Sequence, residues 1–217
     1  MKPRLSIDKL LSEAMEFAVS ESAHDEASLY GVTDGKAVGT YLEHKFQRLL
    51  NNKYVYEIGS SAKGIDFPDL NVDMKVTSIK QPQSSSPFKS ARQKVCGLGY
   101  SLLVFVYSKS DNEETQTAKL DILHVIYVDE SRTADYQTTQ GIRDIISRDG
   151  NAEDIIAFMS DRNLPIDDTE ALELAEELLR NPPQIGYLTI SNALQWRLQY
   201  KRAIEEAGIV GGIQRIA

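Results

Sequence analysis

The sequence predicts an α/β protein in which helices flank a mixed β-sheet and a helical lobe follows at the C-terminal end. Two nearly continuous apolar runs, at 100–107 and 120–128, are typical of strands buried on both faces. Strict alternation of apolar and polar residues over 72–77 indicates another strand with one polar face. Apolar residues at helical spacing precede and follow these strands. We therefore expect residues 1–132 to form the core and 133–217 a helical lobe packed on it, with one continuous domain as the alternative.

The individual elements follow from caps and chain breakers. Ser6 or Asp8 could cap the first helix, glycines at 31 and 35 separate it from the second, and Asp167 could cap a helix of the lobe. The helices that we expect span 1–29, 37–50, 88–97, 138–148, 151–162, 167–180 and 191–207. The strands that we expect span 54–58, 72–77, 100–107 and 120–128, with polar loops at 59–64, 81–88 and 108–117.

Composition is that of an ordinary intracellular protein. The single cysteine, Cys96, excludes an internal disulfide framework and a cysteine-rich zinc site, and the three histidines are scattered. We see neither a signal peptide nor an apolar run long enough to cross a membrane, so we expect a cytoplasmic protein.

Charge is distributed unevenly along the chain, whose formal net charge is −8. Residues 36–109 carry eleven Lys or Arg against five Asp or Glu, whereas residues 110–180 carry six against eighteen. A phosphate-binding face around a metal pocket would give the first segment this balance. The acidic segment is also typical of a solvated helical surface.

The stretch 64–78 contains acidic residues and a lysine that we expect to lie close together. Asp73 and Lys75 are two residues apart on the expected strand and therefore share its polar face. The segment 67–71 has turn-forming residues that fold Asp66 back toward Asp73. Two carboxylates suit a divalent cation such as Mg²⁺, and the ammonium beside them suits an anion or a water. The alternative is an ordinary hairpin with an exposed ion pair.

The pattern Asp66-x6-Asp73-x-Lys75 resembles the active site of the PD-(D/E)xK superfamily of restriction-endonuclease-like nucleases, over residues 36–130. Its short spacing is most similar to the branch that holds the methyl-directed mismatch-repair nicking endonuclease and its restriction-enzyme relatives. This resemblance implies a restriction-endonuclease-like core, Mg²⁺ held by Asp66 and Asp73, catalysis assisted by Lys75, and 5′-phosphate products.

Two assignments within this motif have rivals. In many relatives, a helix before the hairpin lends a glutamate to the metal site, and Glu43 matches that placement as a third ligand and catalytic residue. Glu43 could instead face solvent and pair with Gln47. Asp69 completes a literal Pro-Asp pair and rivals Asp66, but it lies so near Asp73 that the turn would be unusually tight. We therefore assign Asp66 to the metal and Asp69 to the turn.

DNA-binding residues are expected in two places, although plain solvent exposure is the alternative for both. The helix at 88–97 carries basic and amide residues near the motif, and the helix at 191–207 presents amide and basic side chains that could enter a major groove. The candidates are Lys89, Arg92, Gln93, Lys94, Asn192, Gln195, Arg197, Gln199 and Lys201.

The function that these features favour is that of a type II site-specific restriction endonuclease acting on double-stranded DNA. A homodimer would cut both strands of a palindrome symmetrically, and a cognate DNA methyltransferase would protect the same site. Two alternatives stay open at this point. One is a DNA repair or structure-selective nicking endonuclease of the same superfamily, and the other is a non-catalytic DNA-binding module.

Overall fold

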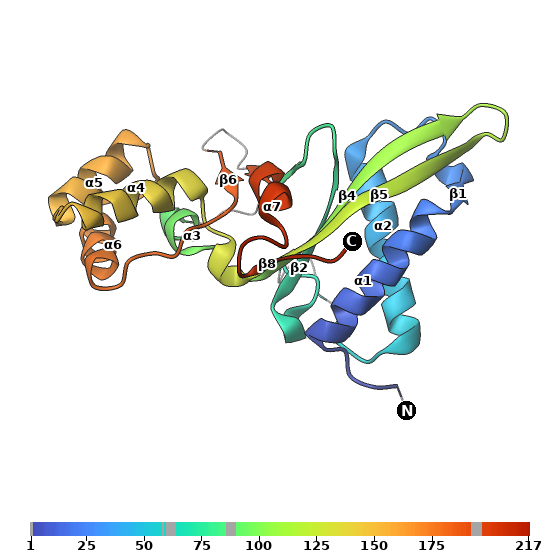
Figure 1. The fold of residues 1–217 in the computed structure, drawn as a ribbon, viewed down its shortest axis with the longest axis horizontal. Helices are drawn as coiled ribbons and strands as arrows, with labels where there is room; N and C mark the ends of the chain where they lie inside the picture. Colours follow the sequence, from blue (N-terminus) through green and yellow to red (C-terminus); the bar gives the residue numbers. More distant parts are fainter. Residues whose placement is uncertain (1, 58, 60–63, 86–89, 192–196) are drawn as a thin grey trace.

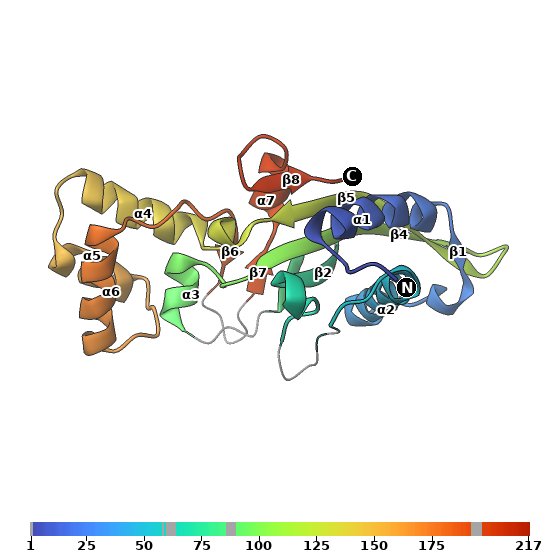
Figure 2. The ribbon, with the colours of Figure 1, turned by 90° about the horizontal axis from the view of Figure 1, so that it is seen from below.

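The computed structural model describes residues 2–57, 59, 64–85, 90–191 and 197–217 (Figure 1). The molecule is elongated, with a sheet and two long helices at one end and a group of helices at the other. A small sheet and the C-terminal helix lie between them (Figure 1, Figure 2). In the described part of the chain, no helix combines the length and the apolar character needed to cross a membrane.

The elements have the following bounds. The helices are α1 Ile7–Ser22, α2 Gly35–Lys53, α3 Ala91–Cys96, α4 Tyr136–Ser147, α5 Ala152–Asp161, α6 Asp168–Arg180 and α7 Lys201–Glu206. The strands are β1 Asp25–Glu26, β2 Val72–Ser78, β3 Gln83–Ser85, β4 Ser101–Asn112, β5 Thr117–Val128, β6 Thr189–Ile190, β7 Arg197–Gln199 and β8 Ile213–Arg215. Short 3₁₀ turns occupy Ala27–Leu29, Pro68–Leu70 and Glu130–Arg132.

The main sheet has the order β1-β5-β4-β2, with β8 also paired to β5. Strand β2 runs parallel to β4, whereas the other pairs are antiparallel, so the predicted mixed sheet is confirmed. Alternation in β2 is also as predicted, because Val72 and Met74 are fully buried on the side that faces the first core. Strands β4 and β5 extend beyond the expected apolar runs to Asn112 and from Thr117, since their hairpin pairing continues through polar residues.

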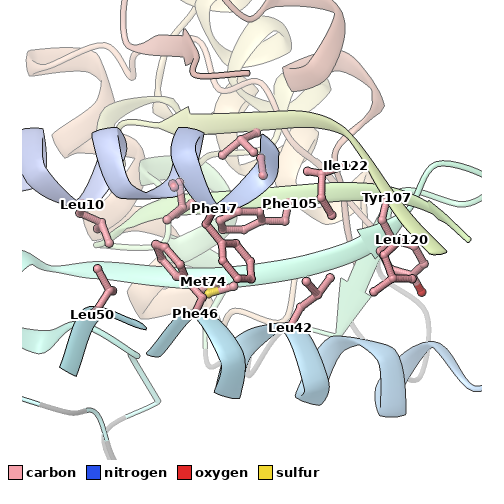
Figure 3. Close-up of a cluster of buried hydrophobic side chains, with 14 of the residues drawn as sticks. Leu10, Phe17, Leu42, Phe46, Leu50, Met74, Phe105, Tyr107, Leu120 and Ile122 are labelled. Carbon is pink, nitrogen blue, oxygen red and sulfur yellow. The ribbon is translucent and has the colours of Figure 1, made fainter. Parts of the chain in front are cut away.

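Helices α1 and α2 cover one face of this sheet and form the first core with it (Figure 3). Phe17, Phe46 and Phe105 meet there with ring centroids 5.1–5.9 Å apart. Two ion pairs of 2.7 Å bind α2 to α1, from Lys53 to Glu13 and from Lys45 to Glu21. The two glutamates are buried, so these pairs fix the rotation of α2 against the sheet.

The other face of the sheet is covered by residues from the C-terminal part of the chain. Strands β3, β7 and β6 form a second sheet in that order, and its apolar side packs on β4 and β5 together with α7. A third core joins α3 to α4, α5 and α6. The helices predicted at 138–148, 151–162 and 167–180 are thus present, and Asp167 caps the last of them as expected.

Three predicted elements are wrong. The helix expected at 191–207 is replaced by β7 and the short α7, because Leu198 and Tyr200 are fully buried while Gln199 between them is exposed, which is the alternation of a strand. The loop expected at 81–88 contains β3, which forms by pairing with β7. The strand expected at 54–58 is reduced to one bridge between Val55 and Arg4 among the described residues.

Candidate active site

The polar face of β2 carries the two residues that the motif predicts. Asp73 is 2% exposed, and its Oδ2 lies 2.7 Å from Nζ of Lys75. Asp73 Oδ2 nevertheless has no directed hydrogen bond and is fully buried. This oxygen therefore has the Lys75 ammonium as its partner and could accept a further electropositive one.

A tight turn brings Asp66 to the same point. The turn Pro68–Leu70 ends at Asn71, whose φ of 54° is left-handed, and Phe67 and Val72 then exchange both backbone hydrogen bonds. Strand β2 lies at the edge of the main sheet, and the backbone N–H of Met74 donates to Asp66 Oδ2 at 2.9 Å. The Asp66 carboxyl also lies close enough to Asp73 to raise the pKa of that buried carboxyl.

Asp69 points to a different surface. Its carboxylate accepts from the Glu57 backbone N–H at 3.2 Å and lies 3.4 Å from the Arg4 guanidinium. The structure therefore brings Asp66, and not Asp69, to Asp73.

Glu43 approaches the cluster from α2. Burial raises the pKa of its half-buried carboxyl, the negative charge of Asp66 raises it further, and the positive charge of Lys75 opposes both. The rotation of α2 thus turns Glu43 toward Asp66 and Lys75, as the interpretation of Glu43 as a site residue requires.

The pKa of Asp73 is raised to about 7. Burial is the largest cause and the Lys75 ammonium opposes it, while the nearby Asp66 carboxyl adds to the rise. Near neutral pH the Asp73 carboxyl is therefore only partly ionised, and a divalent cation bound there would compete with its proton.

The cluster opens into a cleft of about 770 Å³. Glu43 and Lys75 line it beside the start of α2, and the segment from Lys75 to Ser85 supplies much of the remaining wall. Arg197 of β7, one of the residues predicted to bind DNA, also lines the cleft. The other lining residues are Asp34, Gly35, Lys36, Gly39, Thr40 and Tyr107.

The structure does not bring most of the other DNA-binding candidates into this cleft. Arg92 pairs with Glu177 of α6, the Gln93 side chain donates to the Leu98 carbonyl at 3.3 Å, and Lys94 is 6% exposed against the helical group. Gln199 is exposed on β7, and Lys201 is exposed 4.0 Å from Glu205. The candidates Lys89, Asn192 and Gln195 lie outside the described residues.

Several cleft residues were not candidates from the sequence. Thr77 continues the polar face of β2, so the period of two that marked Asp73 and Lys75 could have found it. Lys36 and Thr40 lie on the first turns of α2 and precede Glu43 by roughly two helical turns and one helical turn respectively, a spacing that could have added them. Nothing local in the sequence indicates that Tyr107 borders the cleft.

The donor set suits a hard divalent cation, although no group of three or more potential ligands in the described residues already stands in metal-binding positions. The candidate ligands are all carboxylates, whose oxygens such a cation prefers. Oδ2 of Asp73 is buried without a hydrogen-bond partner, and a bound cation would offset the cost of removing this oxygen from water. Asp66 and Asp73 therefore fit Mg²⁺ as ligands, and Glu43 lies near enough to Asp66 for that charge to raise its pKa.

Comparisons with known proteins find one family, and the match covers nearly the whole chain. A family model described as type II restriction enzyme NspV matches residues 4–215. The type II restriction enzyme NspV of Nostoc sp. (strain ATCC 29411 / PCC 7524) is 64% identical over 209 residues, which cover 96% of this chain and 95% of that enzyme. No solved structure gives a significant match. The chain therefore belongs to the NspV family of type II restriction enzymes, which are endonucleases that act on DNA.

Proposed function

We propose that this chain is a Mg²⁺-dependent PD-(D/E)xK endonuclease that hydrolyses phosphodiester bonds at a specific site in double-stranded DNA and leaves 5′-phosphate ends. The observation that carries this proposal is the convergence of Glu43, Asp66, Asp73 and Lys75, from a helix, a turn and a strand, at one end of a polar cleft. Family membership favours this reading over a repair nuclease or a non-catalytic module.

Asp66 and Asp73 would hold the cation, and Glu43 would complete the acidic side of the site. When bound, Mg²⁺ supplies activation of water and neutralisation of negative charge that develops on the phosphate. The Lys75 ammonium lies 2.7 Å from Asp73 Oδ2 and so stands beside the position that the cation would occupy. It can donate to the attacking water or to the scissile phosphate, a contribution of about 3 kcal/mol to the transition state.

Two identical active sites would be needed to cut both strands of a palindrome symmetrically, so we propose that the enzyme works as a homodimer. A cognate DNA methyltransferase that modifies the same site would protect the host DNA.

Cleavage of unmethylated phage DNA tests the proposal. Wild-type protein should give discrete fragments in Mg²⁺ and none in EDTA. Lys75→Ala should slow cleavage by about 10²–10³-fold, whereas Lys119→Ala, which removes an exposed lysine from the far end of β5, should leave the rate unchanged.

The rival acids provide a matched pair of variants. Asp66→Asn should abolish cleavage, and Asp69→Asn, which changes the same side chain in the same turn, should retain it. Loss of cleavage in Asp69→Asn with retention in Asp66→Asn would reverse the metal assignment. Cleavage that persists in EDTA would overturn the Mg²⁺ mechanism.

A further inference from the structure

The outer face of strands β3 and β7 gathers amide and guanidinium side chains beside the cleft. The strands are antiparallel, and their register pairs Gln83 with Gln199 and Ser85 with Arg197. Residues directly opposite each other in such a pair point to the same face, so these four side chains lie together. Gln83, Ser85 and Arg197 line the cleft, and Gln199 is exposed.

The inner face of the same strands is anchored to the core. Leu198 is fully buried opposite Ser84 and Ile190, and the Ser84 hydroxyl is hydrogen-bonded to the hydroxyl of the fully buried Tyr200. The backbone N–H of Tyr200 also donates to the Pro82 carbonyl at 2.8 Å. Because the inner face is committed to packing, the polar face can only point away from the core.

The catalytic strand fixes where this pair of strands begins. The Thr77 hydroxyl accepts from the Gln83 N–H at 2.9 Å, lies 3.1 Å from the Gln83 carbonyl oxygen, and is 4% exposed. Thr77 is two residues beyond Lys75 on the same face of β2. The position of β3 relative to Lys75 is thereby set by buried hydrogen bonds.

We propose that the polar face formed by Gln83, Ser85, Arg197 and Gln199, here called the recognition ribbon, reads base edges in the major groove of the DNA that the enzyme cuts. This inference rests on the proposed function and adds the element that confers specificity. A major groove admits a two-stranded β-ribbon, glutamine can bond adenine with both ends of its amide, and arginine can do the same with guanine.

The polar groups of the recognition ribbon are available for such contacts. Within the described residues, no hydrogen bond or ion pair engages the side-chain amides of Gln83 and Gln199 or the guanidinium of Arg197. Their proximity to Lys75 places base reading next to the scissile phosphate. A phosphate contact by Arg197 would instead strengthen binding to every sequence alike.

The test uses full-length protein after the cleavage site has been mapped. Duplexes that carry the site and each single base-pair change within it are cleaved under single-turnover conditions in Mg²⁺ by wild type, Gln83→Ala, Arg197→Ala and Gln199→Ala. Two controls remove the same residue types elsewhere: Gln214→Ala on β8 and Arg180→Ala at the end of α6. Thermal unfolding of each variant is recorded in parallel.

Each ribbon variant should cleave the unchanged site about 10- to 100-fold more slowly and lose discrimination at one base pair while retaining it at the others. The proposal that the recognition ribbon reads bases would be overturned if the variants cleave all duplexes more slowly by the same factor, or if they leave all cleavage rates unchanged. Either result would overturn it whether or not thermal unfolding of the variants changes. If wild type cleaves no DNA, the proposed function fails instead. If wild type cleaves and requires Lys75 while the ribbon variants keep its discrimination, only the ribbon fails.

Discussion

Asp73→Asn should inactivate the enzyme and yet stabilise the metal-free protein at neutral and alkaline pH. The carboxylate is 2% exposed, and its pKa rises from 3.8 to about 7 on folding, chiefly because of burial. The native protein therefore binds a proton that the unfolded chain releases, and its stability falls as the pH rises through this range. A neutral amide of the same shape removes that cost.

The size of the effect follows from the same values. At about 1.4 kcal/mol per pH unit, the advantage of the amide at pH 8 is at most about 4 kcal/mol. The change of this advantage with pH is the better test, because hydrogen bonds made or lost by the amide add the same free energy at every pH. Between pH 8 and pH 5 the advantage of Asp73→Asn over wild type should shrink by about 2.5–3 kcal/mol.

Urea unfolding in EDTA at pH 5 and pH 8 measures this difference directly. Asp69→Asn is the matched control, because it makes the same substitution at an exposed position of the neighbouring turn. Added Mg²⁺ should stabilise wild type at pH 8 by about 2.7 kcal/mol at one hundred times its Kd and should not stabilise Asp73→Asn. A variant that is less stable than wild type at pH 8, with a difference that does not change with pH, would refute the reasoning.

Two further predictions concern Glu43 and the first core. Glu43→Gln should lower the cleavage rate about tenfold or more at saturating DNA. The control Glu16→Gln alters an exposed glutamate of α1 and should leave the rate unchanged. Equal cleavage rates in the two variants would remove Glu43 from the site. Phe46→Ala should lower the free energy of unfolding by about 3–5 kcal/mol in urea, because its ring is fully buried against Phe105, while Ile209→Ala at a 77% exposed position should change it by less than about 0.5 kcal/mol.

The parts of the site that depend on local geometry could be predicted from the sequence. Asp73 and Lys75 share a face because a strand has a period of two, and that period is visible over 72–77. Asp66 returns to them because the intervening turn contains a proline and an asparagine that accept the required conformations. The rotation of α2 that directs Glu43 inward could not be deduced, since it is fixed by packing and ion pairs with α1.

The recognition ribbon could not be predicted for a different reason. Strands β3 and β7 are three residues long, and each exists by pairing with a segment that is remote in the sequence. The stretch around Leu198 also contains good helix formers, which favoured the helix that the structure excludes. Burial of Leu198 and Tyr200 against the main sheet outweighs that local preference.

The polar face of β2 joins the proposed catalytic residues to the recognition ribbon through three alternate positions. Asp73 provides a carboxylate, Lys75 provides an ammonium group, and Thr77 is hydrogen-bonded to Gln83, the first residue of the recognition ribbon. Because β2 is an edge strand, its free side can hold Asp66 through the Met74 N–H, which a central strand would have used for pairing. The hydrogen bonds between Thr77 and Gln83 therefore tie the start of the recognition ribbon to the strand that carries Asp73 and Lys75.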